Sequence, residues 1–281
     1  MLWLCRSRAD REKMPLRQRR GIFFAAIFCV ALQGGSLALA ACPPQGSLSA
    51  ARVAAVTDGD TLRLDDGRRL RLLGINAPEL ARDGRPPQPL AEAAQRRAAA
   101  LLGKHRQLYL HSHGVDRYGR LLAEVYLRPD GGHLGEALLA EGLAWHIVVP
   151  PQSRGDDCLQ AAEAEARRRR LGLWALPPLA AERASAADQG FALLRGVVES
   201  VSHSRNAVWV DLRGQVVLRI DHRDLPNFTE QDWSQWPGRR IEVRGWLRSR
   251  RAKAGFAPLK MDLRHPAMMR WTAAELPGDR H

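Results

Sequence analysis

Short apolar and alternating segments follow residue 50, and turn residues separate them. Residues 51–56, 61–64 and 69–73 place Val and Leu among polar positions, and Asp-Gly pairs divide them at 58–59 and 66–67. Such short alternating runs are typical of strands, and Asp-Gly is typical of tight turns. The pattern predicts a meander of three strands.

The next hundred residues combine helical and strand patterns. Residues 91–102 are rich in Ala and contain neither Gly nor Pro, which predicts a helix. Two more strands are expected at 107–111 and 121–127, and two more helices at 133–143 and 156–170. Five strands with a helix between the third and the fourth predict a partly open five-stranded Greek-key barrel of the OB-like type.

A second set of strand patterns follows a segment that is poor in large apolar residues. Five further strands are predicted, at 191–201, 207–212, 216–220, 240–247 and 259–263. We therefore expect a mainly β protein with some α-helix, in which a second OB-like barrel follows the first. The predicted organisation is a signal peptide at 1–41, a first domain at 42–178, a linker at 179–190, a second domain at 191–270 and an unstructured tail at 271–281.

The first 41 residues have the three parts of a secretory signal. Basic residues at 17–20 precede an apolar run at 21–32, and small residues at 38–40 offer a cleavage site. The alternative is a permanent anchor helix, but residues 33–36 interrupt the run before it reaches the roughly 20 residues that a membrane span needs. The segment predicts export to the periplasm or the medium.

Export would leave Cys42 and Cys158 of the four cysteines. A pair of cysteines in an oxidising compartment predicts one disulfide, which would contribute roughly 4 kcal/mol in the chain-entropy model. Two alternatives stay open. Residues 39–42 resemble the lipobox of bacterial lipoproteins, which would acylate Cys42 and anchor the protein, or both thiols are free.

Composition and charge narrow the class of protein. The 281 residues are 45% apolar with eight Trp, which excludes a disordered chain, a collagen-like repeat and a small disulfide scaffold. Lys and Arg number 43 against 30 Asp and Glu, and the resulting charge of +13 favours polyanionic partners without identifying one. The sequence contains no HExxH motif, no P-loop and no serine nucleophile elbow.

Three short motifs lie at the ends of the predicted strands of the first barrel. Residues 58–61 read Asp-Gly-Asp-Thr, residues 71–79 read Arg-Leu-Leu-Gly-Ile-Asn-Ala-Pro-Glu, and residues 116–120 read Asp-Arg-Tyr-Gly-Arg. In this order and at these positions they resemble the thermonuclease, or staphylococcal nuclease-like, family. With later landmarks at 89–93, 142–144 and 172–174, the resemblance covers residues 51–174.

The chemistry explains why these residue types converge. Hydrolysis of a phosphodiester needs an activated water and neutralisation of the charge that gathers on the phosphoryl oxygens. Glu79 can act as a general base, and the guanidinium forks of Arg71 and Arg120 match phosphate oxygens. Asp60 is a hard anionic ligand that can hold a divalent cation on the same phosphate.

The resemblance assigns roles position by position. It implies that the catalytic residues are Arg71, Glu79 and Arg120, and that the ligands of one calcium ion are Asp60, position 76 and the backbone carbonyl of Ala77. Position 76 is Asn76 here rather than Asp, so we expect weaker calcium binding than in a site with two carboxylates. We also expect Tyr118, beside Arg117, to hydrogen-bond a substrate phosphate. The family's base-stacking tyrosines are not evident, because residues 145–150 occupy that place.

The sequence thus predicts an exported, calcium-dependent endonuclease that cleaves DNA and RNA through phosphate contacts with little sequence specificity. By resemblance, cleavage would leave a 3′-phosphate and a 5′-hydroxyl. One alternative is a tandem OB protein of the cell envelope that binds nucleic acid or protein without cutting. In the other, the protein is an envelope scaffold whose second barrel binds a partner.

Other charged residues have simpler interpretations. Asp58 and Asp60 could serve merely to close a turn. Arg71 could pair with Glu79 for stability, and Arg120 could be a solvated loop residue. We interpret 167–170 as a solvated helix end. Residues 248–251 and Lys253 could extend a groove that tracks a nucleic-acid backbone, or could form a solvated loop. The sequence shows no metal-ligand spacing and no Glu partner for His105, His111 and His113, which predicts surface histidines.

Overall fold

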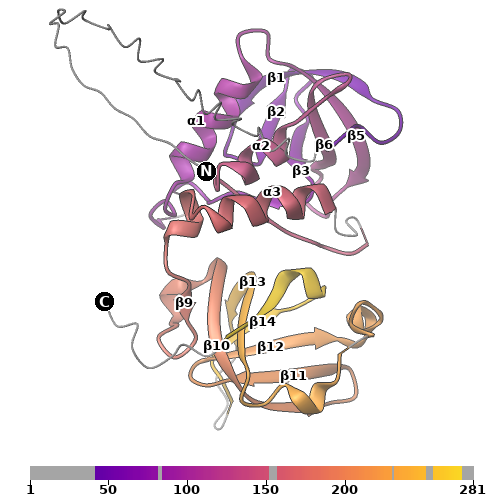
Figure 1. Cartoon of the computed structure of the whole chain (residues 1–281). Coiled ribbons are helices and arrows are strands. Elements are labelled where there is room, and N and C mark those ends of the chain that lie inside the picture. Colours follow the sequence, from indigo (N-terminus) through magenta and orange to yellow (C-terminus); the bar gives the residue numbers. More distant parts are fainter. Residues whose placement is uncertain (1–41, 82–83, 152–156, 230, 251–255, 274–281) are drawn as a thin grey trace, which may run out of the picture. The chain divides into compact units, whose positions relative to one another are not determined.

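The computed structural model describes residues 42–81, 84–151, 157–229, 231–250 and 256–273 (Figure 1). The predicted signal peptide at 1–41 and most of the predicted tail therefore lie outside the described residues. Among the residues that the structure does describe, no helix is long and apolar enough to cross a membrane.

The first barrel follows the predicted meander. Its strands are β1 (Ser49–Val56), β2 (Thr61–Leu64), β3 (Arg69–Leu72), β5 (Gln107–Val115), β6 (Leu121–Arg128) and β7 (Gly131–His133). They pair in the order β3-β2-β1-β5-β6-β7, and a parallel pairing of β3 with β6 closes the barrel. The expected five-stranded OB-like barrel is confirmed.

Helices cover this barrel (Figure 1). They are α1 (Ala91–Leu102), α2 (Leu134–Ala140) and α3 (Asp157–Arg168), with a 3₁₀ helix at Gly172–Ala175. The buried residues of α1 recur at helical spacing: Ala91, Ala94, Ala98 and Leu102. A short ladder of β4 (Ile75–Asn76) with β8 (Trp145–His146) fixes the chain that leaves β3.

The second barrel repeats this pairing scheme. Its strands are β9 (Leu179–Ala180), β10 (Gly190–His203), β11 (Ala207–Leu212), β12 (Val216–Asp221), β13 (Arg240–Ser249), β14 (Leu259–Asp262) and β15 (Met269–Thr272). β10 pairs with both β11 and β13, and β12 pairs in parallel with β14. The connection between the third and fourth barrel strands carries 3₁₀ helices at His222–Phe228 and Trp233–Gln235 in place of an α-helix.

Two segments differ from the sequence-based expectation. Within the expected linker, β9 pairs in parallel with β10, and Ser185 caps a 3₁₀ helix at Ala186–Asp188. The expected tail begins inside β15, which pairs with β13 and places Trp271 opposite Ile241. Both short strands depend on a partner strand far away in the sequence, so their own patterns are too brief to predict them.

The two barrels share one hydrophobic cluster. The sequence did not predict whether the barrels pack together. The cluster contains Trp145, Ile147 and Trp174 from the first domain together with the interior of the second barrel. The rings of Trp145 and Phe191 lie 5.1 Å apart between centroids. The segment in which the family's base-stacking tyrosines were sought is therefore buried between the barrels.

A disulfide joins Cys42 to Cys158, with the Cα atoms 5.5 Å apart. This confirms the predicted pairing and attaches the segment before β1 to α3. The same segment is held by a second contact, because the Cys42 N–H donates to a carboxylate oxygen of Glu136 at 3.0 Å. The chain ahead of the first barrel is thus anchored at Cys42.

Candidate active site

The hairpin between β1 and β2 positions Asp60. The Asp60 N–H donates to Asp58 Oδ1 at 3.0 Å, which shapes the turn. Gly59 is required there, because a Cβ atom at this position would lie 2.6 Å from the Cβ of Ala77 and 2.8 Å from that of Ala94. The Asp-Gly-Asp sequence therefore brings the Asp60 carboxylate against the chain that follows β3.

Arg71, on β3, is the centre of a buried polar network. Its Nη1 lies 2.9 Å from Asp60 Oδ2 and donates to the carbonyls of Leu72 and Ile75 at 3.1 and 2.9 Å. Its Nη2 donates to Asn76 Oδ1 at 3.0 Å. The guanidinium is thereby fixed in orientation, and its ion-pair partner in this network is Asp60.

Asn76 and Ala77 join this network through further hydrogen bonds. The Ala77 N–H donates to Asp60 Oδ2 at 2.5 Å, and Asn76 Nδ2 donates to the Ala77 carbonyl at 3.1 Å. Asp60 is 4% exposed and Asn76 is 1% exposed. The structure thus brings together all the residues for which the sequence predicted a metal-binding role.

Burial dominates the electrostatics of Asp60. Loss of solvation raises the pKa of its carboxyl to about 7, although the Arg71 guanidinium opposes the shift and the neighbouring Asp58 adds to it. The Arg71 guanidinium already stabilises the ionised carboxylate, and a bound metal cation would stabilise it further. A site of carboxylate, amide and carbonyl oxygens fits a hard divalent cation such as calcium.

Glu79 lies three residues beyond Asn76 and is exposed. Its backbone is fixed by Gln88 through two reciprocal hydrogen bonds: the Glu79 N–H donates to Gln88 Oε1 and the Gln88 N–H donates to the Glu79 carbonyl, both at 2.9 Å. The side chain of Gln88 also donates to the carbonyl of Phe191 in the second barrel at 3.1 Å. Gln88 therefore connects the Glu79 segment to β10.

Arg120, Arg117 and Tyr118 belong to a second cluster, in the turn between β5 and β6. Asp116 Oδ1 accepts the N–H groups of Tyr118 and Arg120 at 2.8 and 2.9 Å, and its Oδ2 accepts Nε of Arg120 at 2.8 Å. The Tyr118 ring is 58% exposed and lies 4.8 Å from Arg117 Cζ and 5.6 Å from Arg120 Cζ. The turn presents two guanidinium groups and one phenol together.

The charge of Asp116 is stabilised by this turn. Burial would raise its pKa, but the backbone and side-chain hydrogen bonds from Arg120 outweigh burial and lower it. The cluster is attached to β3, because Arg69 Nη2 donates to the Tyr118 carbonyl at 3.2 Å. The parallel pairing of Leu70 with Leu121 brings the start of β6 beside the strand that carries Arg71.

Two positioning residues were missed by the sequence analysis. Asp116 lay within the third motif, and an Asp two residues before Tyr118 and four before Arg120 is a recognisable turn signal. Gln88 had no such signal, since its partners are a backbone amide nine residues earlier and a carbonyl 103 residues later. The role of Gln88 is therefore evident only in the folded structure.

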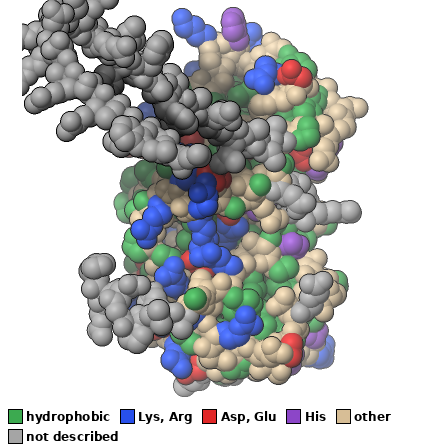
Figure 2. Space-filling view, viewed as in Figure 1, with side chains coloured by type: hydrophobic (Ala, Val, Ile, Leu, Met, Phe, Trp, Pro, Cys, Tyr) green, Lys and Arg blue, Asp and Glu red, His purple; other side chains and the backbone are tan. Residues whose placement is uncertain are grey.

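One expectation about the basic residues was wrong. Arg167 was interpreted as part of a solvated helix end, but it donates to the buried Glu242 and lies over the Trp174 ring at 4.5 Å. Glu242 also pairs with Arg195 and Arg270, each at 3.3 Å. Figure 2 shows Lys and Arg side chains gathered near the middle of the face in view. Residues 251–255 of the predicted basic loop lie outside the described residues.

Known proteins resemble the first domain of this chain in sequence. Residues 69–176 match the family described as Staphylococcal nuclease homologue. Over 124 residues the chain is 36% identical to the thermonuclease of Staphylococcus intermedius, covering 42% of this chain and 72% of that protein. An uncharacterized endonuclease of Escherichia coli is 35% identical over 127 residues, covering 44% and 75%. Endonuclease YncB of Bacillus subtilis is 35% identical over 123 residues, covering 42% and 57%.

Proposed function

The chain belongs to the staphylococcal nuclease homologue family and is a phosphodiester-hydrolysing nuclease, and we propose that it is an exported, calcium-dependent endonuclease. Its substrates are DNA and RNA, cleaved with little sequence specificity. The observation that supports this most strongly is the network of Asp60, Arg71, Asn76 and Ala77, from which the exposed Glu79 is three residues away.

Arg71 contributes a preorganised positive charge. Its four contacts fix the plane of the guanidinium before substrate arrives, so no reorganisation is needed when charge develops on the phosphoryl oxygens. Asp60 and the carbonyls of Leu72 and Ile75 restrain one nitrogen of the fork. Arg120 supplies a second guanidinium, held by Asp116, for the same developing charge.

Glu79 is proposed to orient the attacking water and accept its proton. Its carboxylate is exposed, which allows access to water, while its backbone is fixed on both sides by Gln88. A rigid backbone limits where the carboxylate can lie, and general-base catalysis depends on such positioning. Gln88 acts as a positioning residue in this scheme.

Asp60, Asn76 and the Ala77 carbonyl would hold calcium. The bound cation supplies electrostatic stabilisation of the phosphate. The three donors are all oxygens, which suits calcium, and Asp60 is a buried carboxylate that gains from a neighbouring cation. Asn76 brings no charge, so the site has one anionic ligand and is expected to bind calcium weakly.

Recognition is proposed to act through phosphates. Tyr118 and Arg117 are exposed beside Arg120 and offer a hydroxyl and a guanidinium to the substrate backbone. Phosphates carry no sequence information, and the segment in which base-stacking tyrosines were sought is buried against the second barrel. We therefore expect both DNA and RNA to be cleaved.

Export is supported by the disulfide between Cys42 and Cys158, since such bonds persist in oxidising compartments. We propose that residues 1–41 are removed and that the enzyme is periplasmic or secreted. Lipidation of Cys42 requires its sulfur to be free of Cys158. Mass spectrometry of the mature N-terminus distinguishes the two: an unmodified, disulfide-bonded Cys42 supports release, and a diacylglyceryl group on Cys42 refutes it.

End-group analysis tests the proposed reaction. DNA and RNA oligonucleotides digested with calcium are expected to give 3′-phosphate and 5′-hydroxyl ends, and a chelator is expected to stop the digestion. Products that lack 3′-phosphate ends would refute the assignment. In the same preparation, Asn76→Asp is expected to tighten calcium binding about tenfold by calorimetry, because it adds a second anionic ligand. Equal affinity of the two proteins would contradict the proposed ligand set.

A further inference from the structure

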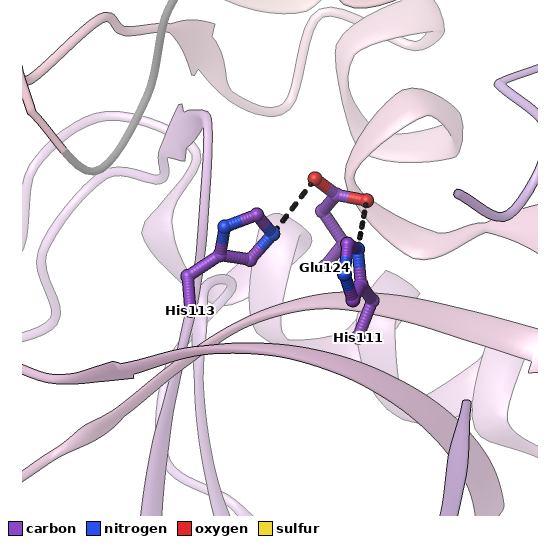
Figure 3. A group of neighbouring side chains, drawn as sticks. All are labelled: His111, His113 and Glu124. Atoms are coloured by element: carbon purple, nitrogen blue, oxygen red, sulfur yellow. Dashed lines mark hydrogen bonds and ion pairs between the residues drawn. The ribbon is translucent and has the colours of Figure 1, made fainter. Parts of the chain in front are cut away.

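Two histidines and a glutamate meet on the surface of the first barrel (Figure 3). His111 and His113 are separated by one residue on β5, so their side chains project from the same face of the sheet. Glu124 on β6 is the register partner of His111 across the antiparallel pair. The Glu partner that the sequence did not show for these histidines is thus supplied by the neighbouring strand.

The three side chains already have nearly the spacing of a metal site. His111 Nδ1 lies 3.4 Å from Glu124 Oε2, and His113 Nε2 lies 3.0 Å from Glu124 Oε1. One potential ligand atom from each residue lies within 4.8 Å of the others. Ligand atoms around a tetrahedral zinc ion are about 3.3 Å apart, so separations of up to 4.8 Å must shorten, because the two histidines contact different oxygens of Glu124. Figure 3 shows both rings turned toward the carboxylate.

We propose that His111, His113 and Glu124 form a second metal site, which binds one zinc ion with water as the fourth ligand. Imidazole nitrogens with one carboxylate are a set that zinc accepts, whereas calcium strongly prefers oxygen ligands. The site shares no residue with the Asp60 network. It holds a different ion for a different purpose.

The surroundings restrain two of the ligands. The hydroxyl of the buried Tyr126 donates to Glu124 Oε2 at 2.9 Å, which orients the carboxylate. The segment before β1 passes over His111, because a Cβ atom at Gly46 would lie only 3.2 Å from His111 Nε2. The side chains of His111 and His113 remain 28% and 27% exposed, so an ion can reach them from solvent.

The proposed zinc site stabilises the folded barrel and takes no part in phosphodiester hydrolysis. Zinc there would cross-link β5 to β6, beneath the segment that the disulfide attaches to α3. Because the ligand set forms only in the folded chain, zinc binding adds to the free energy of unfolding.

Calorimetry with zinc chloride tests the proposal on the protein produced from the full-length sequence without a histidine tag. Excess calcium is present throughout, so that the Asp60 site does not contribute. We expect one zinc ion per chain. His113→Gln and Glu124→Gln are each expected to weaken zinc binding more than about 100-fold, since even the loss of an outer partner costs about 10- to 100-fold. His105→Gln is the matched control, because His105 is exposed outside the cluster.

Thermal unfolding and X-ray absorption give independent measurements. Zinc at about 100 times its dissociation constant is expected to raise the melting temperature of the wild type and of His105→Gln by about 5 °C, and that of His113→Gln not at all. The extended X-ray absorption fine structure of zinc is expected to show two imidazoles with oxygen ligands. No zinc binding, binding that His113→Gln and Glu124→Gln retain, or binding that His105→Gln loses would each overturn the proposal.

Discussion

The two barrels pair their strands alike but use buried charge differently. In each, the first strand pairs with the second and the fourth, and the third strand runs parallel to the fifth (β3 with β6, β12 with β14). The first barrel buries the Asp60–Arg71 ion pair beside Asn76, three residues before the exposed Glu79. The second directs Glu242 and Arg244 toward α3 of the first domain.

The charges of the second barrel hold the two domains together. Arg244 Nη1 lies 2.6 Å from Glu163 Oε2, and both side chains are 9% exposed. The other carboxylate oxygen of Glu163 accepts the His146 N–H at 2.6 Å. The OB-like fold by itself therefore specifies no activity. The residues on its strands determine whether a barrel forms an active site or an interface.

The largest effect is expected from Arg71→Met, which would break the network of the first barrel. Removing the guanidinium deletes a preorganised phosphate contact, so plasmid cleavage should fall about 10²- to 10³-fold. The same change leaves Asp60 and the carbonyls of Leu72 and Ile75 without their buried donor, so urea unfolding should show a loss of about 3–5 kcal/mol. Arg52→Gln, an exposed change on β1, is the control and should alter neither quantity. Wild-type cleavage by Arg71→Met would remove Arg71 from the mechanism.

Arg244→Met tests the interface in the second barrel. It leaves the Glu163 charge buried, so the free energy of unfolding should fall by about 3–5 kcal/mol. Cleavage per folded molecule should not change, because Arg244 pairs with α3 and with the Ala267 carbonyl rather than with the candidate site. The control is Arg168→Met, whose 65% exposed side chain pairs with Glu165 on one helix and should cost under about 1 kcal/mol.

A different result for Arg244→Met would contradict the proposed difference between the two barrels. If Arg244→Met lost cleavage as Arg71→Met does while its unfolding stayed unchanged, the second barrel would belong to the catalytic machinery. Cleavage and unfolding are therefore measured on the same preparations of both variants.

A smaller effect is expected from pH, through His146 at the interface. Burial, then Arg244 and His265, lower its pKa to about 3 from 6.5. The unfolded chain therefore binds the proton first as pH falls below 6.5, and His146 should cost about 2 kcal/mol of stability at pH 5 relative to pH 7.5. Both ring nitrogens lack hydrogen-bond partners among the described residues, so His146→Leu should fold.

The difference between wild type and His146→Leu isolates this histidine. His133, with a pKa lowered to about 4 by burial, acts in the same direction, and Asp60, with a raised pKa, acts in the opposite direction. Both are common to the two proteins and cancel in the difference. His105→Leu is the control. Identical pH dependence of urea unfolding in wild type and His146→Leu would contradict the assignment.

Local patterns predicted much of the fold. The helix at Ala91–Leu102 and the strands at Thr61–Leu64 and Ala207–Leu212 have the predicted bounds, because composition and turn residues mark both ends. β5 runs to Val115, past the predicted end at 111, since pairing with β6 extends it. α2 begins at Leu134 rather than 133, because His133 caps it by accepting the Glu136 N–H.

The candidate site was predictable where its residues lie close in sequence. Asp60, Arg71, Asn76 and Ala77 fall within two motifs at neighbouring strand ends, and the structure brings them together. Gln88 and the partnership of Glu124 with the histidines depend on tertiary contacts and cross-strand register. Hydrophobic patterns with a period of two or 3.6 residues predict strands and helices, but they do not predict tertiary contacts or cross-strand register.

The central claim is that the first barrel hydrolyses phosphodiesters with Glu79 as the base. The direct test is plasmid nicking with calcium and with a chelator, comparing wild type, Glu79→Gln and the exposed helix control Glu92→Gln. Wild type and the control should nick only with calcium, and Glu79→Gln should be about 10²- to 10⁴-fold slower while still retarding DNA. Equal nicking by Glu79→Gln, or no nicking by folded, DNA-binding wild type with any divalent metal, would contradict the account.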